Sequence, residues 1–405
     1  MIGVDYTILN SGTIKSGLTY ASVAVFLGGS GLSKVLVNTG AIQSLATEAG
    51  IAVWVTGSNL TTIDNAGTIR SVGGVAIDAS LATGAIHLNN SGTITSSTPD
   101  ASIVATALAD TILNTGSINW GVVLGNGDDV FDGIGGFVGG AVFGGDGNDV
   151  FRISDPLAQV WEDVGQGLFD RVESTVSFSL VPMGEVEMLT LLGTATDGTG
   201  NYLGNWISGN AMDNRLFGGS GNDTVEGMAG DDTLRGDSGS DVVRGEDGSD
   251  SLRGGSGTDA LYGGAGDDGI WGDVAGDRLY GDEGEDVLVG GAGRDTLYGG
   301  ADADSFVFRA VADSAAGSTL RDVISGFETG LDLIDLTRID ANTVLNGNQA
   351  FAFIGTAAFG SIAGQLRAIH GAFSVLQGDV NGDGVADFEL QLNGIATLRV
   401  NDILL

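Results

Sequence analysis

The apolar and polar positions of this chain repeat with two different periods. Residues 218–307 repeat every nine residues, with glycine first and an apolar side chain eighth, as in GGSGNDTVE and GMAGDDTLR. Residues 1–124 repeat about every 25 residues, as in VLVNTGAIQSL and TIDNAGTIRSV. A fixed period indicates a solenoid, in which every repeat contributes the same strand and turn to a stack of coils. The pattern therefore predicts an all-β protein built from two kinds of coil.

The N-terminal repeat has the form of a strand, a turn and a second strand. Each unit has an apolar strand, an Asn-x-Gly turn and a strand rich in Thr and Ile. Asn and Gly tolerate the backbone conformations that such turns need. We therefore predict a right-handed parallel β-helix over residues 1–124, with one coil per unit. The turn asparagines are 24 to 28 residues apart and would stack at one corner, where their amides satisfy each other: Asn10, Asn38, Asn65, Asn90 and Asn114.

The nine-residue repeat has an acid at the sixth position of every unit. Two half-turns of nine residues make an 18-residue coil, so the aspartates of alternate units lie in one stack, with neighbouring strands about 4.8 Å apart. Carboxylates at that spacing repel each other unless a cation lies between the coils. The preference of Asp for exposed turns would explain some of these acids, but not ten in phase. The predicted metal ligands are Asp223, Asp232, Asp241, Asp250, Asp259, Asp268, Asp277, Asp286, Asp295 and Asp304.

Calcium is the ion that these residues suit. Ca2+ takes six to eight oxygen ligands, which two aspartates and several turn carbonyls can supply. We expect the glycines at positions one, two and four to turn those carbonyls inward. Zinc would need His or Cys, and the repeats contain neither. Two units deviate from the pattern, one with Ala275 at its fourth position and the last with Ala301 and Ala303 beside Asp304. We expect weaker binding at both.

The nine-residue units are identified as members of a known family. Units such as GGSGNDTVE and GGSGTDALY resemble the RTX, or hemolysin-type, calcium-binding nonapeptide repeat. The resemblance implies that residues 218–308 form a calcium-binding parallel β-roll that holds multiple Ca2+ ions. It also implies a bacterial protein that is secreted and folds outside the cell.

Residues 125–217 combine acidic turns with a spacer. GNGDDVFDG and GGDGNDVFR place Asp129 and Asp149 at the acid position, and we count both as candidate metal ligands. They are 20 residues apart, so one turn between them must be irregular. Residues 153–217 resemble spacers between RTX blocks in large secreted bacterial proteins, including the non-catalytic modules of mannuronan epimerases. Asn205 and Asn214 occupy the phase of the later aspartates, which predicts that the solenoid begins before its calcium sites.

The last segment, residues 309–405, has short strands separated by glycines. DVISGFETGLDLIDL and GDVNGDGVADFELQLNG are similar to the C-terminal domain of the serralysin family of secreted metalloproteases. The resemblance implies a β-sandwich-like domain that carries the signal for type I secretion, with the type I secretion machinery as a partner. The final residues, NDILL, match the export-signal pattern of that family.

A second calcium candidate lies within this segment. DVNGDGVAD has oxygen ligands at spacings similar to those of an EF-hand loop, but Leu390 replaces the acid at the twelfth position. Two alternatives stay open, a calcium-binding loop or an Asn-Gly/Asp-Gly hairpin. The candidate ligands are Asp379, Asn381, Asp383 and Asp387.

Composition narrows the class of partner. The 52 acids and 16 bases give a net charge of −36, which argues against nucleic acid and anionic membranes and in favour of cations. The chain has no cysteine, so bound metal is the expected means of stabilising a secreted fold. The segment MIGVDYTILNSG lacks the basic and apolar regions of a cleavable leader, and no apolar run is long enough for a transmembrane span. We expect an extracellular protein that is exported by another route.

The common motifs for catalysis are absent from the sequence, and a Ser-His-Asp triad with His87 or His370 stays an alternative. His87 and His370 lie outside any HExxH motif, and there is no GxSxG motif and no cysteine nucleophile. The acids of residues 1–124 are scattered, with three bases among them. We therefore expect a non-catalytic adhesin, surface-layer or matrix protein, with extracellular polysaccharide or a cell surface as its partner. The alternative is a polysaccharide lyase or epimerase with the β-helix as its catalytic region.

Overall fold

The chain folds as two compact units, Met1–Ala195 and Thr196–Leu405. The structure, a computed structural model, describes residues 6–17, 22–29, 33–97, 99, 101–162, 167, 169–394 and 398–405. Residues 1–5, part of the segment MIGVDYTILNSG in which a leader was sought, thus lie outside the described residues. Within the described ranges the regular structure is β-strand, with two short 3-10 helices, and no helix there has the length and apolarity needed to cross a membrane. The all-β fold class is confirmed.

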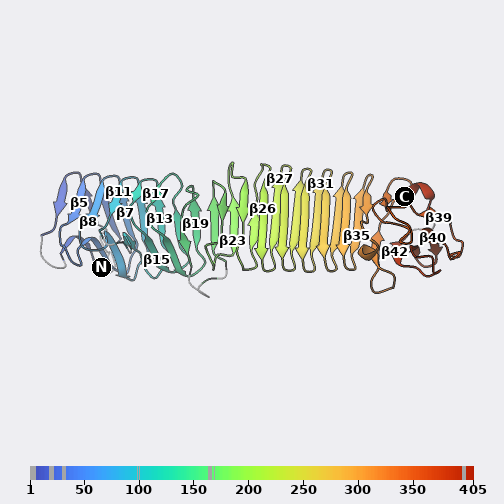
Figure 1. The fold of residues 1–405 in the computed structure, drawn as a ribbon. Coiled ribbons are helices and arrows are strands. Elements are labelled where there is room, and N and C mark those ends of the chain that lie inside the picture. The colour runs from blue at the N-terminus through green and yellow to red at the C-terminus, as the bar shows by residue number, and fades with distance from the viewer. Residues whose placement is uncertain are drawn as a thin grey trace. The chain divides into compact units, whose positions relative to one another are not determined.

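The N-terminal unit is a parallel β-helix with three sheets (Figure 1). Coil follows coil in register, so each strand pairs in parallel with the strand one coil later. The first sheet contains β1 (Tyr6–Asn10), β4 (Lys34–Asn38), β7 (Thr61–Asn65), β10 (Ile86–Asn90), β13 (Thr111–Asn114), β16 (Val130–Asp132), β19 (Val150–Ile153), β21 (Arg171–Ser174) and β23 (Met188–Leu191).

The other two sheets form the remaining faces of the same coils. The second contains β2 (Thr13–Lys15), β5 (Ala41–Ser44), β8 (Thr68–Ser71), β11 (Thr93–Thr95), β14 (Ser117–Ile118) and β17 (Phe137–Val138). The third contains β3 (Val23–Leu27), β6 (Ile51–Gly57), β9 (Ile77–Ala82), β12 (Ile103–Val104), β15 (Val122–Asn126), β18 (Val142–Asp146) and β20 (Val160–Trp161). A short strand, β22 (Phe178–Ser179), follows β21. The β-helix thus continues beyond residue 124, through the two acidic turns.

Stacked apolar side chains fill the interior of this unit. Because inward and outward side chains alternate along a strand, matching positions of successive coils contact one another inside. The pattern follows from the sequence, since each strand of the first sheet carries an apolar residue at the same position. One buried column on that sheet is Leu36, Ile63, Leu88, Ile112, Phe131, Phe151, Val172 and Leu189.

The predicted asparagine stack is confirmed. The side-chain amide of Asn10 donates to Oδ1 of Asn38 at 2.7 Å, Asn38 to Asn65 at 2.7 Å, Asn65 to Asn90 at 2.7 Å and Asn90 to Asn114 at 2.8 Å. The amide of Asn114 ends the series on the carbonyl of Phe137. All five side chains are buried. A buried polar ladder of this kind is stable because every amide has both a donor and an acceptor partner.

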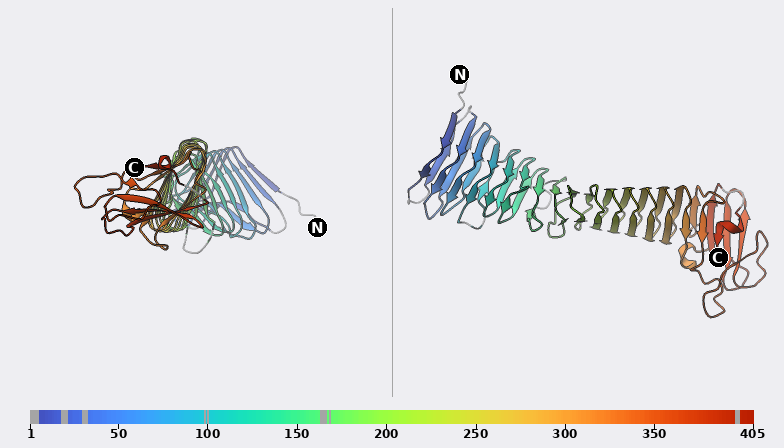
Figure 2. Two further views of the ribbon diagram at one scale, coloured as in Figure 1. Left: turned by 90° about the vertical axis from the view of Figure 1, so that its right-hand side faces the viewer. Right: turned by 90° about the horizontal axis from the view of Figure 1, so that it is seen from above.

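The C-terminal unit begins as a β-roll of two parallel sheets (Figure 2). Strands pair with a register of 18 residues, such as Leu216 with Leu234 and Val225 with Val243. One sheet contains β25 (Trp206–Ser208), β27 (Thr224–Ala229), β29 (Val242–Asp247), β31 (Ala260–Ala265), β33 (Arg278–Glu283) and β35 (Thr296–Ala301). The other contains β24 (Asp197–Thr199), β26 (Arg215–Ser220), β28 (Thr233–Ser238), β30 (Ser251–Ser256), β32 (Gly269–Val274), β34 (Val287–Ala292) and β36 (Ser305–Val307).

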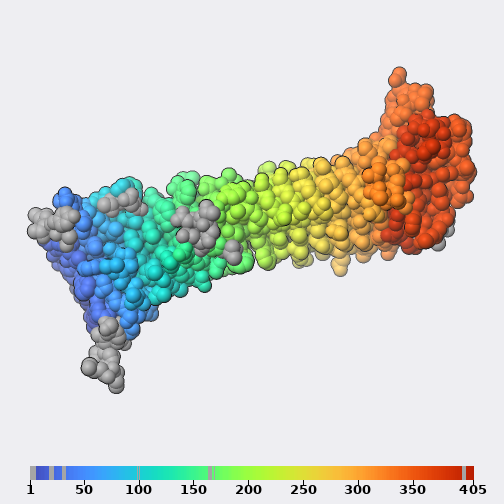
Figure 3. Space-filling view, turned by 90° about the horizontal axis from the view of Figure 1, so that it is seen from below, coloured from blue at the N-terminus to red at the C-terminus, as the bar shows by residue number. Residues whose placement is uncertain are grey.

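The apolar residue at the eighth position of every repeat forms the core between these sheets. Each is fully buried, as the sequence pattern requires: Val225, Leu234, Val243, Leu252, Leu261, Ile270, Leu279, Leu288, Leu297 and Phe306. On the face that Figure 3 shows, the side chains of successive coils meet as a continuous surface. The core of the roll is therefore a single column of apolar side chains from each sheet, between the two corners.

The C-terminal segment extends both sheets of the roll. β37 (Asp322–Ser325) pairs in parallel with β35 and β42 (Phe388–Asn393), and β42 continues antiparallel to β41 (Ser374–Asp379), which pairs with β40 (Gln365–His370). β39 (Ala352–Phe353) pairs with β40, while β38 (Leu333–Asp335) joins β36 to β43 (Ile403–Leu404). The 3-10 helices are η1 (Val311–Ser314) and η2 (Val400–Asp402). That this segment forms a sandwich of its own stays a prediction.

Candidate metal centre

The ten repeat aspartates lie at the two corners of the roll, directly before its strands. All ten are buried, and each exposes at most 3% of its surface to solvent. Each accepts a hydrogen bond at Oδ1 from the backbone N–H of the residue 18 positions earlier, which is an aspartate for the eight from Asp241 onward, as Asp241 accepts from Asp223 at 2.8 Å and Asp250 from Asp232 at 2.7 Å. The two predicted stacks of alternate aspartates are therefore confirmed as neighbours in space.

The second carboxylate oxygen of every one of these aspartates has no hydrogen-bond partner. Oδ2 is fully buried and unpaired in Asp223, Asp232, Asp241, Asp250, Asp259, Asp268, Asp277, Asp286, Asp295 and Asp304. A buried polar atom without a partner costs about 1–3 kcal/mol, and an ionised one costs more. Ten such atoms in two rows are far too many for a stable interior, and a cation is the partner that would satisfy them.

Glycine at the first position of each repeat makes room for this oxygen. A Cβ atom at Gly236 or Gly254 would overlap Oδ2 of Asp241 or Asp259, five residues later in the same unit. The second and fourth positions both have a positive backbone φ, as at Gly255 (114°) and Gly257 (124°), which glycine adopts without strain, although five second positions reach it with other residues: Met228, Asp237, Glu246, Asp273 and Asp282. The first position therefore shapes the metal-facing side of the corner, and the other two allow its tight turn.

The pKa values of these carboxyls show how poorly the corner accommodates charge without metal. Burial is the largest cause, and it raises the pKa of Asp277 to about 8 and that of Asp232 and Asp268 to about 7. Backbone hydrogen bonds lower each pKa, and the next aspartate of the stack raises it again. Hard oxygen ligands without nitrogen or sulfur suit calcium.

The two stacks extend beyond the regular repeat at both ends. Before the first aspartates, Asn205 and Asn214 occupy the same position, and their backbone N–H groups donate to Asp223 and Asp232 at 2.7 and 2.6 Å. The solenoid thus begins before its acids, as predicted. After the last repeats, Asp295 donates to Asp322 at 2.8 Å and Asp304 to Asp332 at 3.1 Å. The sequence analysis missed these two acids because their spacings are 27 and 28 residues.

The deviating units keep the geometry of the others. Ala275 adopts a φ of 87° and Asp302 a φ of 76°, so each is in the left-handed conformation that glycine adopts elsewhere in the series. Asp277 and Asp304 still lie in their stacks with Oδ2 unpaired. Weaker binding at these units stays a prediction, with backbone strain as its physical reason.

The N-terminal unit has its own acid stack at one corner. Asp110 donates to Oδ1 of Asp129 at 2.6 Å, Asp129 to Asp149 at 2.7 Å and Asp149 to Asp170 at 2.8 Å, while Asp170 donates to Glu187. Asp129 and Asp149 were predicted from the sequence, and both have an unpaired Oδ2. Asp110, Asp170 and Glu187 were missed because coil length varies from 17 to 21 residues here.

The loop at 379–387 joins two antiparallel strands, β41 and β42. Asp379 accepts from the N–H groups of Gly382 and Gly384 at 2.7 and 2.9 Å. Asn381 and Asp383 accept from N–H groups two residues later, and Asp387 accepts from Asn381 and Val380. These bonds form a hairpin, which is one of the two alternatives that the sequence left open. Each candidate ligand in this loop already accepts a hydrogen bond. Calcium binding by the loop stays a prediction.

Comparison with known families identifies the repeat. A family model described as the RTX calcium-binding nonapeptide repeat (4 copies) matches residues 199–234, 208–243, 235–270, 244–279 and 271–306. These residues are RTX calcium-binding repeats, and calcium is the ion that they bind. The match begins at residue 199, so it includes the two half-turns with asparagine, Asn205 and Asn214, at the acid position.

Two further comparisons add little. The solution structure of the AlgE6R3 subunit from the Azotobacter vinelandii mannuronan C5-epimerase is 22% identical and covers 50% of this chain and 78% of its own, with a TM-score of 0.20. Nothing about this chain follows from a similarity of that size. Among the curated proteins, none matches the chain. The similarity of residues 309–405 to serralysins stays a prediction.

Proposed function

We propose that the chain is a secreted calcium-binding protein whose β-roll folds on meeting extracellular calcium after type I secretion. One observation carries this proposal, the row of buried, unpaired Oδ2 atoms along each corner of the roll. These atoms make the folded roll unfavourable without a cation and favourable with one. Binding free energy then becomes folding free energy.

Export suits a chain that stays unfolded inside the cell. At low calcium the aspartate stacks would repel each other, so the roll would remain expanded, as passage through a narrow channel requires. Extracellular calcium-binding modules have dissociation constants of about 10⁻⁴–10⁻³ M. The serralysin-like pattern of residues 309–405 supports this route, with NDILL as the proposed export signal.

We assign the N-terminal unit the role of a non-catalytic adhesin, surface-layer or matrix element. Its third sheet presents an outward row of aligned side chains, Phe26, Trp54, Asp78, Val104, Val123, Phe143 and Trp161. Phe143 and Trp161 also line a groove of about 690 Å³. Exposed rings beside a concave surface favour binding of an extended apolar-faced ligand such as a neutral polysaccharide.

The alternative is a polysaccharide lyase or epimerase that works in this groove. Such chemistry needs titratable groups beside the substrate, and among the described residues that line the groove none has a titratable side chain. That observation favours binding over turnover. Incubating the chain with acidic and neutral polysaccharides and assaying both retention and product formation separates the two roles, since any turnover contradicts the adhesin assignment.

The folding proposal is tested by calcium titration of the full chain. Far-ultraviolet circular dichroism should gain β-structure between chelator and millimolar calcium. Replacing Asp259 by Asn should raise the calcium midpoint roughly tenfold, because a carboxylate ligand worth about 1.4 kcal/mol is lost.

Asp247→Asn is the matched control, because it removes the same charge from an exposed position of the repeat. Its midpoint should be within about twofold of that of the parent chain. A spectrum that does not change with calcium, or equal shifts in the two variants, would contradict calcium-coupled folding.

A further inference from the structure

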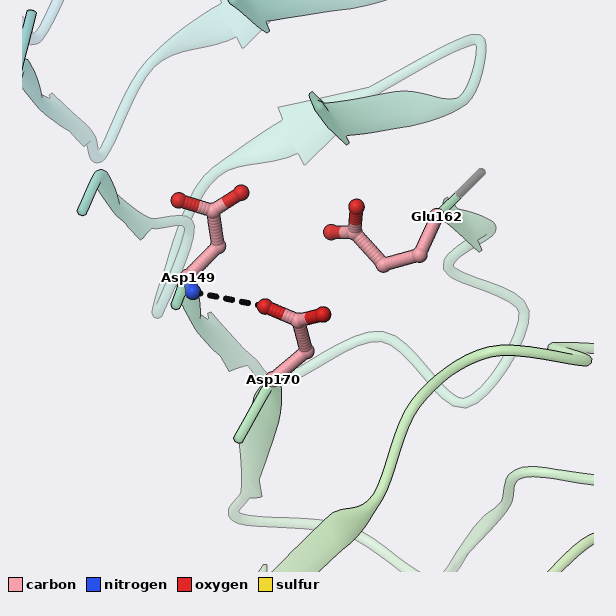
Figure 4. Close-up of side chains that lie close together, drawn as sticks. All are labelled: Asp149, Glu162 and Asp170. Carbon is pink, nitrogen blue, oxygen red and sulfur yellow. Dashed lines mark hydrogen bonds between the residues drawn. The ribbon is translucent and has the colours of Figure 1, made fainter. Parts of the chain in front are cut away.

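Three acids of the N-terminal unit converge outside the RTX repeats (Figure 4). Asp149 precedes β19, Glu162 directly follows β20, and Asp170 precedes β21. One carboxylate oxygen from each lies within 4.8 Å of the others. The residues come from neighbouring coils and two different sheets, so the fold, not the sequence repeat, brings them together.

One oxygen of each of the three carboxylates already accepts a hydrogen bond from a backbone N–H. Asp149 Oδ1 accepts from the N–H of Asp129 at 2.7 Å, Asp170 Oδ1 from that of Asp149 at 2.8 Å, and Glu162 Oε2 from that of Gly145 at 3.1 Å. These bonds fix the orientation of each carboxylate. The remaining oxygens turn toward a common space, as Figure 4 shows.

Two of the remaining oxygens are buried and unpaired. Asp149 is fully buried, and its Oδ2 has no hydrogen-bond partner. Glu162 Oε1 is also a buried atom without a hydrogen-bond partner. A Cβ atom on Gly144 would overlap both atoms, so the glycine leaves the room that they occupy. An unpaired acceptor in a fully buried side chain, aimed at two other carboxylates, points to a missing cation.

Among the residues that the structure describes, no basic side chain forms an ion pair with Asp149, Glu162 or Asp170. Arg152 and Arg171, two arginines of this unit, form ion pairs with Asp132 and Glu173 instead. Burial, followed by the charges of neighbouring acids, raises the pKa of Glu162 to about 9. For Asp170 and Asp149 burial is again the largest cause, with pKa values of about 7 and 6.

We propose that Asp149, Glu162 and Asp170 bind one calcium ion that is separate from the ions of the RTX repeats. Three carboxylate oxygens without nitrogen or sulfur ligands suit a hard cation, and calcium tolerates the irregular geometry that ligands from different coils impose. The ion would join the turn before β19 to the end of β20, so it would stabilise a corner where coil length is irregular.

Hydrogen exchange of the full chain locates this ion. In the parent chain, adding calcium chloride after chelation should slow exchange over residues 142–162, where the N–H groups of Gly145 and Asp149 lie, as well as over the roll. In Glu162→Gln the roll should still respond to calcium, while residues 142–162 should lose at least half of their calcium-dependent protection. Equilibrium dialysis should show one calcium ion fewer per chain.

Glu48→Gln is the control, because Glu48 is an exposed acid of the same unit. It should retain both the protection of residues 142–162 and the full number of ions. Equal calcium binding by Glu162→Gln and the parent chain would overturn the proposal and leave calcium-coupled folding of the roll intact.

If Glu162→Gln fails to fold, which rapid exchange at the asparagine stack would reveal, the parent chain alone decides. Residues 142–162 that exchange equally fast with and without calcium would then overturn the site.

Discussion

The two solenoids of this chain place different side chains at equivalent corners. At one corner of the N-terminal unit the buried residue is asparagine, and the amides form a ladder in which each donates to the next. In the roll it is aspartate, and each carboxylate accepts one backbone N–H and keeps one oxygen unpaired. The asparagines end their strands and the aspartates directly precede theirs, but in both stacks one buried side chain per coil contacts the next coil.

That difference decides whether the fold depends on a ligand. An amide carries donor and acceptor together, so a stack of amides is complete by itself. An ionised carboxylate only accepts, so a stack of carboxylates needs donors or cations from outside. The coils with the asparagine stack are therefore expected to fold without a ligand at that corner, while the roll is expected to fold with calcium.

Acid should replace calcium in the roll but have no effect on the asparagine stack. The folded, metal-free pKa values of Asp259, Asp268 and Asp277 are raised from 3.8 to about 6, 7 and 8. Because folding raises these pKa values, protons stabilise the metal-free roll. The stabilisation is complete below about pH 4 and is lost as the pH rises through 6 to 8.

In chelator, we expect the circular dichroism of the full chain to show more β-structure at pH 5 than at pH 8. Calcium affinity should have the opposite dependence, since protons compete with the ion. The control is hydrogen exchange at the asparagine stack, which has no titrating group. Equal spectra at the two pH values would show that carboxylate charge is not what holds the roll open.

Replacing Asn65 by Asp should give the β-helix the weakness of the roll. Asn65 is buried, and its amide donates to Asn90. An aspartate there would place an ionised oxygen against an acceptor, so we expect a loss of about 3 kcal/mol of unfolding free energy at neutral pH. Urea unfolding in millimolar calcium measures this loss, and the loss should shrink at pH 4 as the carboxyl gains a proton. Thr47→Asp, which adds a charge at an exposed turn, should change stability by less than about 0.5 kcal/mol.

Replacing Ala275 by Gly should have the smallest effect, in the direction of a stronger roll. Ala275 has a φ of 87°, a conformation that glycine adopts without strain. We expect a gain of about 1 kcal/mol in calcium, seen as a higher melting temperature and a lower calcium midpoint. Ala265→Gly is the matched control at a strand position without positive φ, where the substitution should destabilise instead. A loss of stability on Ala275→Gly would show that the deviating unit is not strained.

Regular spacing explains why much of the corner chemistry could be predicted. The ten repeat aspartates and the five asparagines recur at near-constant distances, so their stacking followed from arithmetic on the sequence. Asp322 and Asp332 extend the two aspartate stacks of the roll after intervals of 27 and 28 residues. Asp170 extends the acid stack of the N-terminal unit after an interval of 21. A longer loop between two coils breaks the sequence period, so these residues cannot be found from their spacing. The strands on either side still pair in register, and this places the side chains in the stack.

The all-β class, the two solenoid periods and the identity of the metal can be read from the repeats, because each repeat encodes its own strand, turn and ligand. The tertiary structure alone decided which carboxylate oxygens are left without a partner. It also decided that Glu162 approaches Asp149 and Asp170 from another sheet. Those outcomes depend on how successive coils align, and alignment is set by packing across coils that no single repeat specifies.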